Sequence, residues 1–212
     1  MGFFDVLLKP NDVFPAEKPN ASMGKAVKRY AVYGLVTGLI AGIILFFVLG
    51  ALTSIVGPAA GGLLDNPLVG AGLGALGIVG IVLLVIFSVI WTVIWSAIAA
   101  LVIWIVSKAL GGTGEFKDNY YLLSLPLWPV LAGTLVLGIV SVVLVFIPVL
   151  GWLLIGLIWL AWIVYMLYVT VTAVSVANGF SKLKALGVMV ILFVVWMIIS
   201  FATGLGRFTP VA

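Results

Sequence analysis

The sequence predicts an all-α integral membrane protein: a bundle of five transmembrane helices, with its N-terminus in the cytoplasm and its C-terminus outside. Of the 212 residues, 65% are hydrophobic and only 8% are charged, and the mean hydropathy is +1.43. A typical soluble domain is about 25% charged, so a soluble fold of this composition would have too few polar residues to cover its surface. Long uncharged runs and a strongly one-sided distribution of basic residues give the number and direction of the spans.

Residues 1–29 are predicted to form a cytoplasmic amphipathic tail. This segment contains many charged residues and no long apolar run, so it does not have the pattern of a cleavable signal peptide. Several large apolar residues precede Pro10, and they would form either a short helix lying in the lipid headgroup region or an apolar plug packed under the bundle. These residues are Phe3, Phe4, Val6, Leu7 and Leu8.

Residues 30–212 are predicted to form the transmembrane domain. A span needs about 20 apolar residues, because the hydrocarbon core is about 30 Å thick and a helix rises 1.5 Å per residue. Five runs meet this requirement, and charged residues, glycines and prolines separate them. The spans are expected at about 30–52, 81–108, 122–146, 152–177 and 183–203.

The second run leaves the number of spans open, because residues 68–107 contain no charge. One straight helix of this length would measure about 60 Å. It could be a single long helix, a bent helix with a glycine-rich lead-in over residues 68–80, or a hairpin that would give six spans. Asn66 followed by Pro67 is a typical helix start.

The positive-inside rule favours five spans over six. With five spans, nine of the ten basic residues face the cytoplasm and Arg207 lies outside; with six, the split is six to four. The sequence between residues 82 and 107 also has no turn signal where a hairpin could reverse. The nine residues are Lys9, Lys18, Lys25, Lys28, Arg29, Lys108, Lys117, Lys182 and Lys184.

The chemistry that most enzymes use is missing from this sequence. There is no cysteine and no histidine, and none of the five runs has a membrane-buried Asp, Glu, Lys or Arg, since Lys108 and Lys184 lie at the ends of their runs. Glu115 and Asp118 lie together in one loop beside Lys117, a pattern typical of a solvated charge cluster. We therefore expect no catalytic, cofactor or metal site, and the lack of an intramembrane charge also argues against an ion-coupled transporter.

Ser88, Thr92 and Ser96 recur at every fourth position and make one polar stripe on the second span. Such a stripe could line a polar path, which keeps open the alternative of a passive channel or a lipid-handling protein. More commonly it provides hydrogen bonds between helices.

The first span has glycines at every fourth position, Gly34, Gly38 and Gly42. Small residues at this spacing allow two helix backbones to approach closely, either inside the bundle or at an oligomer seam. Trp91 and Trp95 lie deep in the second span, where we expect them to fill the core of the bundle or to wall a ligand cavity.

Three sequence motifs suggest a family. The central loop and the following residues read "LGGTGEFKDNYYLLSLPLWPVLAG", with a Gly-Gly turn, a Phe-Lys pair and a proline about ten residues further on. "LLKPNDVF" lies in the tail and "NGFSKLKAL" lies before the last span. In this order and with five spans, the chain resembles the Yip1 domain family.

The resemblance implies a non-enzymatic scaffold or organiser in membrane or trafficking-like processes. Eukaryotic members bind Rab-type GTPases through a long cytosolic N-terminal region, whereas the tail here has only about 29 residues. The sequence is therefore similar to a compact prokaryotic-type member, which is expected in a prokaryotic cell membrane. Expected partners are membrane lipids and a protein at the cytoplasmic face, with homo-oligomers left open and no nucleic acid.

The central loop, residues 110–121, is interpreted as the cytoplasmic connection between the second and third spans. Gly111 and Gly112 would end the second helix through a positive-φ cap, Tyr120 and Tyr121 would anchor the chain at the membrane interface, and prolines would delay the third span. The resemblance makes this loop and the basic loop before the last span the candidate interaction surface. Its residues are Gly111, Gly112, Phe116, Lys117, Pro126, Lys182 and Lys184.

Overall fold

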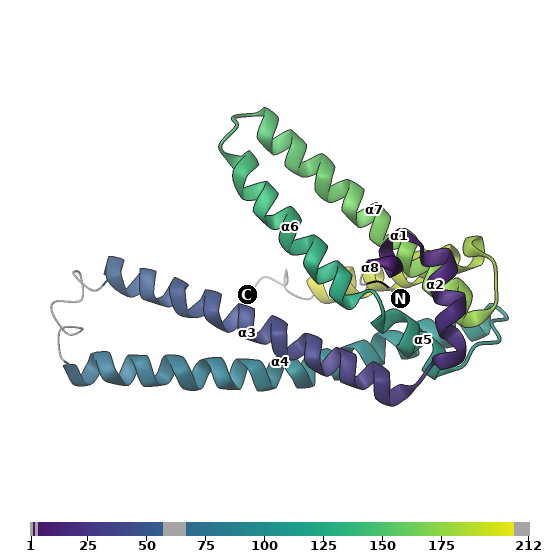
Figure 1. Ribbon diagram of the computed structural model, residues 1–212, viewed down its shortest axis with the longest axis horizontal. Helices are drawn as coiled ribbons and strands as arrows, with labels where there is room; N and C mark the ends of the chain where they lie inside the picture. The colour runs from purple at the N-terminus through teal and green to yellow at the C-terminus, as the bar shows by residue number, and fades with distance from the viewer. Residues whose placement is uncertain (1, 3, 57–66, 206–212) are drawn as a thin grey trace. The chain divides into compact units, whose positions relative to one another are not determined.

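The computed structural model describes residues 2, 4–56 and 67–205, and helices account for all the regular structure in these ranges (Figure 1). The elements are α1 (Asp5–Leu8), α2 (Pro10–Glu17), the 3-10 helix η1 (Lys18–Asn20), α3 (Met23–Val56), α4 (Pro67–Ala109), α5 (Phe116–Ser124), α6 (Leu127–Val145), α7 (Leu150–Asn178) and α8 (Lys182–Leu205).

Five helical stretches of the described chain are long and apolar enough to cross a membrane, which confirms the predicted number of spans. The chain is therefore an integral, multi-pass membrane protein. The stretches are Met23–Val48, Gly77–Ala109, Phe116–Val145, Leu150–Asn178 and Lys182–Phe201. The predicted loop over residues 57–66, with Asn66, lies outside the described residues, as do Arg207 and the C-terminus.

The run that left the span count open is one helix. α4 has 43 residues and begins at Pro67, so the glycine-rich lead-in belongs to the same helix as the span. At 1.5 Å per residue this helix is about 64 Å long, about twice the thickness of the hydrocarbon core. The hairpin alternative is wrong for this reason.

The chain divides into two compact units. The first contains residues 1–26 and 98–212, and the second contains residues 27–97. In the second unit, the glycines of α3 lie against α4, as the spacing predicts for packing inside one chain. A Cβ atom added to Gly34 would lie 2.9 Å from the Ser88 carbonyl oxygen, and one added to Gly38 would lie 3.0 Å from the Val85 Cα.

The polar stripe of α4 contributes to this packing. The Ser88 hydroxyl donates a hydrogen bond of 2.9 Å to the Gly34 carbonyl, and Ser96 donates to the Val93 carbonyl of its own helix. Trp91 and Trp95 stack on each other at 5.6 Å and are both more than half exposed. The prediction that they fill the core is wrong, because the close contact of the two helices occupies a different face of α4.

In the first unit, α6 and α7 form an antiparallel pair (Figure 1). The turn between them is tight: Val149 has a φ of 59°, and a Cβ atom on Gly151 would lie 1.9 Å from the Leu144 carbonyl oxygen. Ser141 on α6 accepts a hydrogen bond of 3.0 Å from the Trp159 indole on α7.

The predicted third span has an interruption near its start. α5 ends at Ser124, and α6 begins after Pro126, which is its N-cap. Proline has no N–H group to continue a helix, so the predicted delay at this position is confirmed. The residues from Tyr120 to Leu122 are almost completely buried in the protein and do not face lipid.

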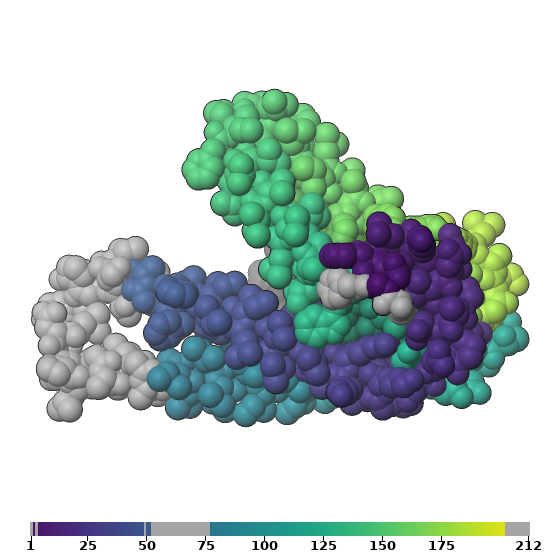
Figure 2. Space-filling view, in the orientation of Figure 1, coloured from purple at the N-terminus to yellow at the C-terminus, as the bar shows by residue number. Residues whose placement is uncertain are grey.

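The polar end of the first unit forms a packed body that we call the head. It consists of residues 5–20, 100–126 and 169–189, and Figure 2 shows its N-terminal segment in purple packed over the teal and green of α5 and α7. Its apolar core brings together residues from α4, α7 and α8, namely Ile103, Val171, Val174, Ala185 and Val188.

Candidate functional site

The centre of the head is the C-terminal end of α7. The last four carbonyl groups of any helix have no partner within the helix, so they need other donors when they are buried. Here the Gly179 and Phe180 N–H groups both bond to the Ser175 carbonyl, and Gly179 has the left-handed φ of 68° that favours glycine.

Two distant segments supply donors for the other carbonyls. Lys18 donates from Nζ to the Val176 carbonyl at 2.8 Å. Thr113 donates to the Asn178 carbonyl from its N–H at 2.9 Å and from its hydroxyl at 3.3 Å. A positive charge beside a helix C-terminus also interacts favourably with the helix dipole. The end of α7 therefore fixes both the N-terminal segment and the central loop.

A pair of buried asparagines connects α5 with α7. Asn119 donates to the Asn178 side-chain oxygen at 3.2 Å, and Asn178 donates to the Asn119 side-chain oxygen at 2.8 Å. The Asn119 amide also donates to the Glu115 carbonyl, and the Asn178 amide also donates to the Val174 carbonyl. Both side chains are 0% exposed, so each amide is satisfied entirely by protein. Neither residue was among the predicted site residues.

Substitution of either asparagine by leucine is expected to destabilise the head. Asn119→Leu leaves the Asn178 side-chain oxygen without its donor, and a buried unsatisfied polar group costs about 1–3 kcal/mol. We expect Asn119→Leu and Asn178→Leu each to lower the free energy of unfolding by about that amount in detergent. The double variant should cost less than the two singles together, and strictly additive losses would contradict a direct pair.

Glycines of the central loop allow it to approach α7. Gly111 has a φ of 86°, which confirms the predicted positive-φ cap after α4. The Gly112 N–H bonds to the Ser107 carbonyl at 2.8 Å. A Cβ atom added to Gly114 would lie only 2.1 Å from the Ala177 carbonyl oxygen, so the loop backbone lies directly on the last turn of α7.

The N-terminal segment, Asp5–Asn20, contacts the rest of the head at several points along its length. Val6, Leu7 and Phe14 are buried, and Phe14 is 0% exposed. The Tyr121 hydroxyl donates to the Glu17 carboxylate at 2.7 Å, and Lys182 donates to the Asn11 side-chain oxygen at 2.5 Å. The sequence left open a helix in the lipid headgroup region or an apolar plug under the bundle. The buried face of this segment, with Val6, Leu7 and Phe14, agrees with the apolar plug.

The acidic residues of the loop differ in their surroundings. Glu115 is the N-cap of α5, and its N–H bonds to the Asp118 carboxylate at 3.1 Å in a capping box. Asp118 is only 8% exposed, so the prediction that it is solvated is wrong: the capping box draws it onto the start of the helix. Glu115 is solvated as predicted, and it pairs with Lys117 at 3.0 Å.

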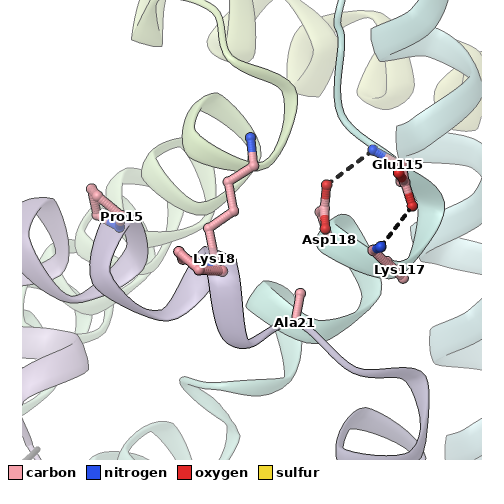
Figure 3. Close-up of a pocket in the computed structure, with 7 residues that line it drawn as sticks. Pro15, Lys18, Ala21, Glu115, Lys117 and Asp118 are labelled. Carbon is pink, nitrogen blue, oxygen red and sulfur yellow. Dashed lines mark hydrogen bonds and ion pairs between the residues drawn. The ribbon is translucent and has the colours of Figure 1, made fainter.

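A shallow hollow of about 390 Å³ opens beside α5 (Figure 3). Its charged groups already have partners: Lys18 reaches the end of α7, Asp118 belongs to the capping box, and Lys117 pairs with Glu115. The remaining lining is apolar or small. Among the residues that the structure describes, no three His, Cys, Asp or Glu side chains come together as metal ligands.

The structure places the residues of the candidate interaction surface at different depths. Gly111, Lys117, Lys182 and Lys184 are exposed, Phe116 and Pro126 are half-buried, and Gly112 is buried.

Phe116 belongs to an aromatic cluster, stacked on Tyr120 at 5.7 Å and edge-on to Trp104 at 6.5 Å. Tyr120 and Tyr121 are 1% exposed, so the prediction that they anchor the chain at the membrane interface is wrong. They lie in the core of the head because α5 packs against α7.

Sequence comparison gives the family. No curated protein and no solved structure matches the chain. The family model of the Yip1 domain matches residues 4–204, a range that contains the head and all five membrane-spanning stretches. This match covers nearly the whole chain, and the chain therefore belongs to the Yip1 domain family.

Proposed function

We propose that this protein is a non-enzymatic membrane scaffold or organiser, acting in a trafficking-like process of the membrane that it spans. The membrane is expected to be a prokaryotic cell membrane, with the head on the cytoplasmic side. The observation that carries the proposal is the construction of the head: segments far apart in the sequence are hydrogen-bonded and packed onto the end of α7. Such a body can hold surface groups at fixed positions.

The surface groups that we propose to be functional are the exposed lysines Lys117, Lys182 and Lys184. Lys182 is held by Asn11 and lies 4.8 Å from the centre of the Tyr168 ring. Lys117 is paired with Glu115, whereas Lys184 projects from the first turn of α8. Groups that are ordered before binding lose less entropy when a partner arrives. We infer that this surface favours acidic lipid headgroups or an acidic protein.

The channel hypothesis receives less support. It depends on the hydroxyl stripe of α4, but Ser88 bonds to the Gly34 carbonyl and Ser96 bonds within its own helix. The Ser88 hydroxyl therefore joins α4 to α3, and bonding between helices is the commoner use of such stripes.

Charge removal tests the proposed surface. Each basic residue near an anionic membrane contributes about 1 kcal/mol, and salt weakens this attraction. In nanodiscs of mixed lipids, the triple variant of Lys117, Lys182 and Lys184 to Gln is expected to lose several-fold preference for anionic over zwitterionic lipid, measured by native mass spectrometry. Since Glu115 compensates the charge of Lys117, whereas Lys182 is held by a neutral amide, Lys182→Gln and Lys184→Gln should each account for a larger share of this loss than Lys117→Gln.

Glu115→Gln is the matched control, because it removes a negative charge from the same surface and should raise the preference for anionic lipid. If neither the triple variant nor Glu115→Gln changes lipid preference or the recovery of acidic partners, the lysines serve only to orient the chain.

The proposed orientation is tested with single cysteines, since the native chain has none. Ser181 is exposed on the head, and Val149 is 83% exposed at the turn between α6 and α7. Ser181→Cys should react with a membrane-impermeant maleimide only from the cytoplasmic side, and Val149→Cys only from the other side. Labelling of both from one side would refute the orientation and the span assignment of α7.

A further inference from the structure

The burial pattern of α7 indicates where the membrane surface crosses this helix. Between Leu150 and Tyr168, many side chains of α7 are exposed, and most of these are apolar. After Tyr168, most side chains of α7 are buried in the head. Residues 150–168 span about 28 Å, close to the hydrocarbon thickness of about 30 Å. The neighbouring α6, with 19 residues, has the same length. Tyr165 and Tyr168 therefore lie at the level where tyrosines are enriched, the interface of lipid and water.

The N-terminal segment runs along α7 in the same direction. The Tyr165 hydroxyl donates to the Leu7 carbonyl, the Asn11 amide donates to the Tyr168 hydroxyl at 2.9 Å, and Lys18 reaches the Val176 carbonyl. These contacts advance along α7 by about 16 Å. α1 therefore lies at the level of the membrane surface, while the end of α2 lies well above it.

The two faces of α1 differ sharply. Val6 and Leu7 are 2% and 6% exposed and point into the protein, whereas Leu8 is 74% and Phe4 is 48% exposed. Phe4 and Leu8 are four residues apart and so share one face. The next residue, Lys9, is exposed. Large apolar side chains beside a basic residue are the composition of segments that lie in the headgroup region.

We propose that the outer face of α1, formed by Phe4 and Leu8, inserts into the headgroup–acyl boundary of the same bilayer that α6 and α7 cross. The side chains of α7 that are exposed up to Tyr168 are mostly apolar, as lipid contact requires, and the Tyr165–Leu7 hydrogen bond places α1 beside the cytoplasmic end of this stretch. The Lys9 side chain is long enough to keep its ammonium group among the lipid phosphates. The outer face of α1 is thus a second membrane contact, formed by residues that belong neither to the spans nor to the lysine surface of the head.

Fluorescence quenching tests this placement on the full chain. A cysteine-reactive, environment-sensitive fluorophore is attached at Leu8→Cys, and separately at Phe4→Cys, in protein reconstituted into phosphatidylcholine vesicles. Ala16→Cys on α2 is the matched control, because Ala16 is exposed on the same segment but lies above the membrane surface. Leu160→Cys, at the middle of the spanning part of α7, marks the hydrocarbon core.

The quantity compared is quenching by lipid with a doxyl group at acyl carbon 5, divided by quenching by aqueous iodide. We expect this ratio at Leu8 and Phe4 to exceed the ratio at Ala16 more than twofold, with a blue-shifted emission maximum. A ratio within twofold of the Ala16 value at either position overturns the proposal, because that side chain would then face water.

Discussion

Gly114→Ala is expected to destabilise the head more than alanine at any other glycine of the head. The added Cβ atom would lie 2.1 Å from the carbonyl oxygen and 2.8 Å from the carbonyl carbon of Ala177. Both are backbone atoms of the last helical turn, which cannot move without breaking the Thr113–Asn178 hydrogen bonds. Overpacking a tight contact costs about 1–3 kcal/mol and can cost more, and we expect a loss of at least about 3 kcal/mol here.

Thermal unfolding in detergent measures this loss against two glycine controls. Gly138→Ala places a Cβ atom in open space inside α6, where alanine should be neutral or stabilise by about 0.5–1 kcal/mol. Gly111→Ala meets no atom but has a φ of 86°, so it should cost about 1–2 kcal/mol from backbone strain alone. A Gly114→Ala variant as stable as Gly138→Ala would mean that the loop does not lie on α7.

Phe14→Ala is expected to release the N-terminal segment from the rest of the head. Phe14 is 0% exposed, and loss of a fully buried phenylalanine side chain costs about 3–5 kcal/mol. The segment should then become accessible to protease between α1 and α3 while the spans stay folded. The measurement is the rate of limited proteolysis of protein in detergent, read by mass spectrometry of the released N-terminal peptides.

Phe47→Ala is the matched control, because the same side chain is 70% exposed on α3. Its effect on stability should stay within about 0.5 kcal/mol, and the protease sensitivity of the N-terminal segment should not change. Unchanged proteolysis of Phe14→Ala would contradict the docked position of the segment.

The spans could be predicted from the sequence because each depends on local properties. A run of about 20 apolar residues forms a membrane helix whatever its neighbours are, and this rule identified all five stretches. The spacing of Gly34, Gly38 and Gly42 likewise predicted a close helix contact. The positive φ of Gly111 followed from a glycine pair at the end of a helix.

The head could not be predicted, because its main polar contacts join residues that lie between 59 and 171 positions apart in the sequence. Asn119 and Asn178 look like ordinary loop and cap residues until the fold brings their amides together. The sequence around Asp118 did not show whether its carboxylate is solvated or accepts the capping hydrogen bond from the Glu115 N–H. Periodicity and composition describe one segment at a time, so they give no information on such pairs.

The predicted burial of two tyrosines and two tryptophans was also wrong, because it too depends on contacts with other helices. Tyr120 and Tyr121 were placed at the membrane interface and are buried, whereas Trp91 and Trp95 were placed in a core and are exposed. Tyrosine and tryptophan suit either place, since each has an apolar body and a polar group. Only the packing of the neighbouring helix decides between them.

The distance in sequence between the N-terminal segment and its site on α7 has a consequence for biosynthesis. Leu7 and Lys18 each bond to residues that follow 158 positions later. At about 5–20 residues per second, the ribosome needs roughly 8–30 s to make that stretch, and the nascent segment has no docking site during this time. During this time we expect Val6, Leu7 and Phe14 to be covered by a chaperone or by the membrane. A chain truncated before α7 would keep these apolar residues exposed, and proteases could recognise it by them.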